Sequence, residues 1–146
     1  IAEGTANFGI DVVLPGKDRI EFEKRILFPI AGMDSNKTER YYQIHELFLK
    51  LGYAGNEAAR GYLNGIMTRD EAAIWLVKYA LMSPDRALQR TRFFDTYRSY
   101  VINYNLGQDL VKQYIEKRGG TPDKPQKRWE EFKKLISSPR LPSGLT

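Results

Sequence analysis

Hydrophobic residues recur at helical spacing through most of the chain, and residues that start or end helices bound each run. The clearest start is Thr68-Arg69-Asp70-Glu71. It has the form of a capping box, in which threonine and glutamate side chains each bond a backbone amide of the other. Ser83-Pro84 then ends one helix and begins the next, with serine as cap and proline at the first helical position. The pattern predicts six to eight helices and an all-α fold.

The N-terminal run, residues 1–14, keeps approximate helical spacing and stops at Pro15-Gly16. A strand over residues 9–14 is the competing prediction, because isoleucine and valine there favour β-structure. A second helix is predicted from a cap at Asp18 through Phe28, with Pro29 as its stop.

The helix predicted over residues 37–51 is amphipathic, and Gly52 stands where a left-handed C-terminal cap belongs. Asn56 is predicted to cap a shorter helix after it. The last helix is predicted over residues 128–136, with Trp129, Phe132 and Ile136 on one side.

The longest predicted helix covers residues 84–118, and the fold is expected to be organised around it. Because that length exceeds the usual range, we expect a kink or break near residues 105–107, Asn-Leu-Gly. Phe94, Tyr97, Val101 and Tyr104 line one stripe of this helix at spacings of three and four. The stripe has two interpretations: a core helix whose tyrosines satisfy one another, or a helix that walls a polar cleft.

The predicted organisation is a single domain. Residues 1–120 form a helical body, residues 121–127 a linker with two prolines, and residues 128–146 a C-terminal helix and an extended tail that packs on the body. The chain opens Ile-Ala-Glu-Gly without an initiator methionine, and we expect it to be a piece of a longer protein.

Composition narrows the classes of function. The chain has 146 residues, of which 42% are hydrophobic and 28% charged, as in a soluble globular protein. No run reaches the length of a membrane span. The absence of cysteine excludes disulfides and thiolate metal sites, and it favours the cytoplasm while leaving the compartment unknown. The single histidine, His45, excludes a multi-histidine cage built from this chain alone and is interpreted as an ordinary structural side chain.

The net charge of +5 is uneven. Residues 1–107 hold 14 basic and 13 acidic side chains, and residues 108–146 hold 9 and 5. This bias is too mild to indicate nucleic-acid binding.

Two polar constellations remain as candidate sites. Glu3-Gly4-Thr5-Ala6-Asn7-Phe8 sets a carboxylate among small residues at a helix start, where the helix dipole also favours it. Arg98, Tyr100 and Tyr104, with Asn103 and Asn105 beside them, carry the donors that an enzyme directs at an oxyanion or a substrate carboxylate. Internal hydrogen bonding of a packed helix is the alternative for this second group.

The order of these segments resembles the C-terminal part of bacterial proteins related to gluzincin-type HExxH zinc peptidases, including a carboxypeptidase-like family. Such proteins are mostly helical and take their third zinc ligand from a glutamate in a context like E-G-x-A-x-aromatic, which residues 3–8 match. They also carry arginine and tyrosine ahead of a tyrosine-containing segment that ends in glycine and faces the metal, which Arg98, Tyr100 and the 104–107 segment resemble.

The resemblance implies a zinc-dependent hydrolase in which Glu3 is the third metal ligand. Tyr100 or Tyr104 would stabilise the oxyanion, and Arg98 would bind a substrate carboxylate or orient the tyrosines. The HExxH pair is absent from these residues, so it would come from a preceding part of the parent protein. This chain alone is expected to hold no zinc and to be inactive, since zinc needs about three protein ligands.

The alternative function is a non-enzymatic helical module that binds protein through a basic C-terminal segment with Trp129 and Phe132 as apolar anchors. The basic residues of that segment are Lys117, Arg118, Lys124, Lys127, Arg128, Lys133 and Lys134. Nucleic acid is a weaker partner for it, because a stacking platform needs exposed rings and these aromatic residues sit at core-like spacing.

Overall fold

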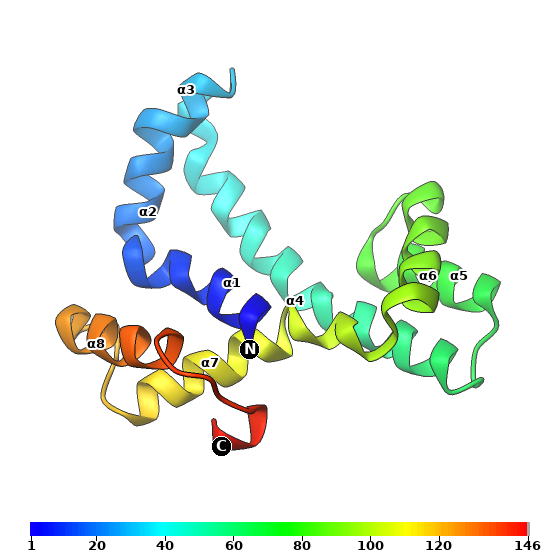
Figure 1. The fold of residues 1–146 in the computed structure, drawn as a ribbon. Helices are drawn as coiled ribbons and strands as arrows, with labels where there is room; N and C mark the ends of the chain where they lie inside the picture. The colour runs from blue at the N-terminus through cyan, green and yellow to red at the C-terminus, as the bar shows by residue number, and fades with distance from the viewer. Residues whose placement is uncertain (146) are drawn as a thin grey trace. The chain divides into compact units, whose positions relative to one another are not determined.

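A computed structural model describes residues 1–145 and shows an all-helical chain, which confirms the predicted fold class (Figure 1). No strand occurs within that range. The helices and helical turns, in chain order, are α1 Ala2–Val13, α2 Gly16–Phe22, η1 Glu23–Leu27, α3 Phe28–Ile30, η2 Ser35–Lys37, α4 Thr38–Leu63, α5 Arg69–Ala80, α6 Pro84–Tyr97, η3 Arg98–Asn103, α7 Leu106–Lys117, α8 Pro125–Ile136 and η4 Pro142–Gly144.

The chain forms two compact units, and the boundary does not follow the predicted organisation. Unit 1 combines residues 1–42 with residues 103–146, and unit 2 is the continuous stretch 43–102. The predicted body of residues 1–120 therefore contains parts of both units. The chain passes from one unit to the other inside α4 and again at the end of η3.

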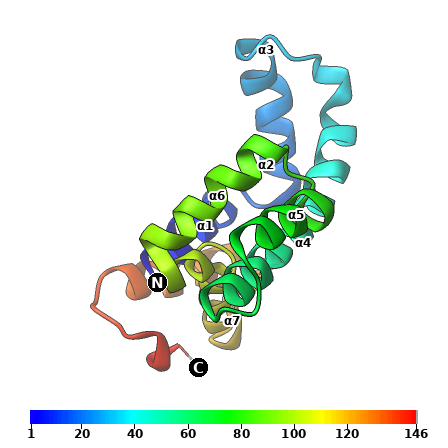
Figure 2. The same ribbon diagram turned by 90° about the vertical axis from the view of Figure 1, so that its right-hand side faces the viewer.

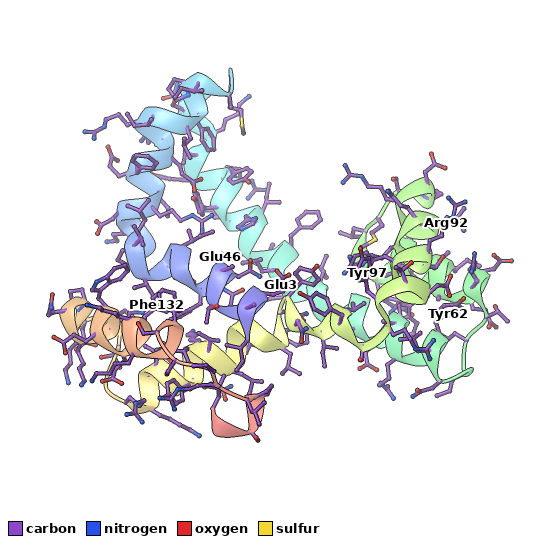
Figure 3. All side chains as sticks on the ribbon, in the orientation of Figure 1. Glu3, Glu46, Tyr62, Arg92, Tyr97 and Phe132 are labelled. Carbon is purple, nitrogen blue, oxygen red and sulfur yellow. The ribbon has the colours of Figure 1, made fainter. Side chains whose placement is uncertain are left out.

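Unit 1 is built on α1, α7 and α8. Its buried core joins residues from these three helices and one residue of the tail, namely Phe8, Val111, Tyr114, Ile115, Phe132, Leu135 and Leu145. The Phe8 and Phe132 rings lie 6.2 Å apart, and Figure 3 labels Phe132 on α8. Leu145 is 3% exposed, so the end of the described chain packs into this core.

The first fifteen residues resolve one ambiguity: residues 2–13 are helix α1, and the competing strand prediction is wrong. The next prediction fails at both ends. Pro15, not Asp18, stands at the N-terminal cap of α2, and the chain stays helical through Pro29. A π-turn explains this tolerance, because the Phe28 amide bonds the carbonyl of Glu23. Proline has no amide to donate, and the Lys24 carbonyl accepts from the Ser35 hydroxyl at 2.9 Å.

Unit 2 packs α5 and α6 against the later part of α4, and α5 and α6 lie side by side in both ribbon views (Figure 2). Its buried core is small-residue rich and consists of Ala58, Ala59, Ala73, Leu76, Ala87, Phe94 and Val101. The Thr68–Glu71 capping box is present, as predicted, with the Thr68 amide 2.7 Å from the Glu71 carboxylate. Ser83 and Pro84 begin α6, also as predicted.

Two predicted helix ends inside α4 are wrong. The helix continues through Gly52 and Asn56 to Leu63, over 26 residues. Ala58 and Ala59 are buried beyond Gly52, and the Trp75 indole donates to the Ala54 carbonyl at 3.0 Å. Packing of this half against the rest of unit 2 outweighs the roughly 1 kcal/mol that a glycine costs in a helix interior.

The predicted helix over residues 84–118 is broken, as expected: the break begins at Arg98, earlier than predicted, and ends at Asn105, the N-cap of α7. The α-helix ends at Tyr97, because Arg98 adopts a positive φ of 49°, and a 3-10 segment continues to Asn103 before α7 begins. The two halves belong to different units, so no single central helix organises the fold. In the described range no helix is both long and apolar enough to cross a membrane.

Candidate functional site

Glu3 lies in the first turn of α1 and is half-buried (Figure 3). A carboxylate at this position is stabilised by the positive end of the helix dipole. The helix begins directly after Ile1, whose carbonyl accepts a hydrogen bond from the Thr5 amide at 2.8 Å. Glu3 is therefore placed at the end of α1, where the helix meets the rest of unit 1.

Gly4 brings α1 into backbone contact with α7. A Cβ atom added to Gly4 would lie 2.9 Å from the backbone nitrogen of Gln108 and closer still to the carbonyl of Gly107. No side chain fits between the two backbones, so a glycine is required at this position. The small residues of the 3–8 motif therefore have a structural role. Gly4 allows the α7 backbone at Gly107 to approach the backbone of α1.

Asn7 fixes the same contact from one turn further along α1. Its side-chain amide nitrogen donates to the backbone carbonyl of Tyr104 at 2.9 Å. Asn105 then caps α7, since its side-chain oxygen accepts from the Leu106 amide at 2.9 Å. The motif at residues 3–8 and the segment at residues 104–107 lie side by side in unit 1, although almost a hundred residues separate them in sequence.

Arg98 and Tyr100 belong to unit 2, unlike Glu3 and Tyr104. Arg98 is exposed and ends α6 with φ 49° and ψ −124°, a conformation that side-chain-bearing residues rarely adopt. Tyr100 is 41% exposed, and its ring lies 6.3 Å from that of Tyr97. Tyr97 itself is 52% exposed, so its predicted place in a buried stripe with Phe94 and Val101 is wrong. The α-helix also ends at Tyr97, so the residues after it do not continue the stripe at helical spacing.

The carboxylates and the histidine of the described residues do not gather into a metal centre. Within residues 1–145 no three aspartate, glutamate or histidine side chains come close enough to hold an ion together. A zinc ion needs about three protein ligands, and Glu3 offers one. Among residues 1–145, Glu3 is not joined by two further such side chains.

The sequence interpretation missed a buried carboxylate, that of Glu131, which lies on α8 and is 2% exposed. Its carboxylate accepts from Lys127 Nζ at 2.8 Å, Lys134 Nζ at 2.9 Å and Arg118 Nε at 2.8 Å. These hydrogen bonds, first from Lys127 and then from Lys134 and Arg118, hold the pKa of Glu131 far below its usual range. The spacing of three and four from Glu131 to the two lysines was visible in the sequence, whereas its contact with Arg118, the C-cap of α7, was not.

Arg128 is a second buried charge that the sequence did not reveal. It is 6% exposed, and its guanidinium lies 4.8 Å from the centre of the Phe8 ring. Trp129 and Ile136, which were predicted to share the packed side of the last helix with Phe132, are 45% and 57% exposed. The helix also begins at Pro125, inside the predicted linker. Of the seven basic residues in the predicted binding segment, three are therefore bound to Glu131 and Arg128 is buried.

No family model, no curated protein and no solved structure matches this chain.

Proposed function

We propose that this chain is the helical C-terminal part of a zinc metallopeptidase-like protein of the bacterial gluzincin type, and that Glu3 supplies the third metal ligand. The support is the contact between α1 and the start of α7. The two short motifs of the resemblance, at residues 3–8 and 104–107, lie against each other through the Gly4–Gly107 approach and the Asn7–Tyr104 hydrogen bond. Two motifs of one site must lie close together in space. Segments so far apart in the sequence need not be neighbours in the fold, so their contact supports a shared site.

Under this proposal the other zinc ligands, an HExxH pair, come from polypeptide outside these 146 residues. The chain alone is then inactive and binds zinc no tighter than a surface carboxylate does. Tyr104 would present its hydroxyl to a developing oxyanion beside Glu3. The resemblance implies the same role for Tyr100 as the alternative, and substrate binding for Arg98. The parent's N-terminal part is the partner that the proposal requires.

The test uses the parent reading frame. Its sequence before Ile1 should encode HExxH, and the complete polypeptide should contain one zinc per chain by elemental analysis and cleave unstructured peptides. Glu3→Gln should lower zinc affinity about 10- to 100-fold or more, because the loss of a zinc ligand costs at least as much affinity as the loss of a residue that supports a ligand. Asp11→Asn is the matched control, since it removes a carboxylate from the same helix and should leave zinc content unchanged. Full zinc content in Glu3→Gln, or no HExxH upstream, would refute the proposal.

The alternative of a protein-binding module stays a prediction. Its predicted binding surface is the basic C-terminal segment. Fewer cations of that segment are available to a partner, because Arg118, Lys127 and Lys134 bind Glu131. We therefore rank it second.

A further inference from the structure

A pocket of about 740 Å³ lies within unit 2, where α5 gives way to α6. Its lining residues come from α4, the end of α5, the connection and the first three turns of α6: Phe48, Ala80, Leu81, Met82, Ser83, Arg86, Gln89, Arg90 and Phe93. None of the residues proposed for the zinc site lines it. The inference drawn from it is independent of the proposed function.

The connection is shaped by a left-handed residue at the end of α5. Leu81 has φ 54° and ψ 33°, and the Met82 amide reaches back to the Leu76 carbonyl at 3.3 Å. This closure turns the chain sharply into Ser83 and Pro84. The N-terminus of α6 consequently lies at one wall of the pocket, beside the end of α5.

The charge of the lining is positive. Arg86 and Arg90 contribute two guanidinium groups, and no aspartate or glutamate is among the lining residues. Asp85 lies beside Arg86 in the first turn of α6, but it does not line the pocket. A concave surface with two cations and no lining carboxylate favours an anion, and a guanidinium can bind a carboxylate or phosphate with two parallel hydrogen bonds.

Further donors face the same region. Ser83, the N-cap of α6, also lines the pocket, and its hydroxyl can donate a hydrogen bond. In the first turn of α6, Pro84 has no amide hydrogen and Ala87 donates to the Ser83 carbonyl, which leaves the amides of Asp85 and Arg86 without an intrahelical acceptor. The positive end of this 14-residue helix adds to the attraction. Gln89 adds a side-chain amide.

The remaining wall is apolar and aromatic. Phe48 and Phe93 line it together with Ala80, Leu81 and Met82. The Arg90 guanidinium lies 4.5 Å from the centre of the Phe93 ring, a cation–π contact that holds the charge against the apolar wall. A ligand that matches both parts must therefore carry an anionic head and an apolar body.

We propose that this pocket binds a small amphipathic anion, with its head between Arg86, Arg90 and the N-terminus of α6 and its apolar body against Phe48 and Phe93. The site is a ligand-binding site of unit 2. It needs no metal and no residue of unit 1.

The test is a set of three probes with one apolar body: 4-phenylbutyrate, 4-phenylbutanol and 4-phenylbutylamine. Binding to the 146-residue chain is followed by ¹H–¹⁵N NMR titration, which locates the site on the backbone. We expect 4-phenylbutyrate to shift the amides of residues 81–90 and to bind at least about tenfold more tightly than the alcohol, with the amine weakest. A further titration with phenylbutyl phosphate then shows whether the site prefers a carboxylate or a phosphate head group.

Arg86→Glu should lower affinity for 4-phenylbutyrate about tenfold, since it both removes and reverses a charge at the pocket. Arg92→Glu is the matched control, because Arg92 is an exposed arginine of the same helix outside the lining (Figure 3). Both changed side chains are exposed, and the NMR spectrum reports whether each variant is folded. Equal binding of the three probes, equal effects of the two variants, or shifts confined to residues that do not line the pocket would overturn the proposal.

Discussion

A methyl group on Gly4 would meet the α7 backbone, whereas a methyl group on Gly107 would make only ordinary contact with Gly4, 3.7 Å away. The two glycines face each other, yet only one of them is required by space. This asymmetry gives a stringent test of the α1–α7 contact.

Gly4→Ala should lower the free energy of unfolding of unit 1 by roughly 1–3 kcal/mol, the cost of overpacking, despite the better helix propensity of alanine. Gly107→Ala should be neutral or stabilise by up to about 1 kcal/mol, because its methyl group fits and alanine favours the helix. Urea unfolding followed by Trp129 fluorescence in a Trp75→Phe background reports unit 1. Equal losses in the two variants would show that the backbones do not meet as described.

Glu131 makes stability depend on pH in a defined direction. Its folded-state pKa is lowered from 4.5, because Lys127, Lys134 and Arg118 donate to the carboxylate. The stabilisation is therefore fully present above the unfolded value and is lost as pH falls below about 4.5 toward the folded-state pKa.

Glu131→Gln should cost about 1–3 kcal/mol at pH 7, since the lost hydrogen bonds are charge-assisted but their donors are partly solvated. The deficit relative to the wild type should shrink as pH falls below 4.5. Glu130→Gln, an exposed neighbour on the same helix, is the control and should change stability by less than about 0.5 kcal/mol. Thermal melts across this pH range decide it, and a deficit that grows in acid would contradict the assignment.

Phe94 and Tyr97 differ sharply in their packing, although the sequence places them on one stripe. Phe94→Ala should cost about 3–5 kcal/mol, because the ring is fully buried and leaves a cavity. Tyr97→Ala should cost less than about 1 kcal/mol, because half of that side chain is exposed. Chemical denaturation of the two variants measures the difference, and a large loss at Tyr97 would restore the buried stripe.

Arg98 holds an unfavourable backbone conformation at the end of α6. Arg98→Gly should raise stability by about 1 kcal/mol, because glycine adopts positive φ without strain. Arg98→Ala should leave stability nearly unchanged, since it keeps the strain and removes only an exposed side chain. A destabilising glycine variant would indicate that the arginine side chain makes a structural contact.

What the sequence predicted well was local. The capping box at Thr68–Glu71 and the Ser83-Pro84 start lie within a few residues and need no tertiary information. The predicted helix ends at Gly52 and Pro29 were wrong because other contacts outweighed local preference. Beyond Gly52, Ala58 and Ala59 are buried. Before Pro29, the helix forms a π-turn, and the Ser35 hydroxyl donates to the Lys24 carbonyl.

The candidate site shows the same division. Helical spacing placed Phe94 and Val101 correctly in the core, but it could not foresee that Arg98 would end the α-helix or that Tyr97 would be exposed. Nor could it pair Asn7 with the Tyr104 carbonyl, since that bond joins distant segments. The membership of Glu3 and Arg98 in different units likewise depends on contacts that no local pattern records.

Because unit 1 is made from both ends of the chain and unit 2 from its middle, synthesis on the ribosome imposes an order on folding. All of unit 2 precedes α7 in the chain, so during synthesis residues 43–102 can fold before α7 and α8 are available to α1. Throughout that interval α1 exposes Phe8 to the surroundings without the helices that later bury it.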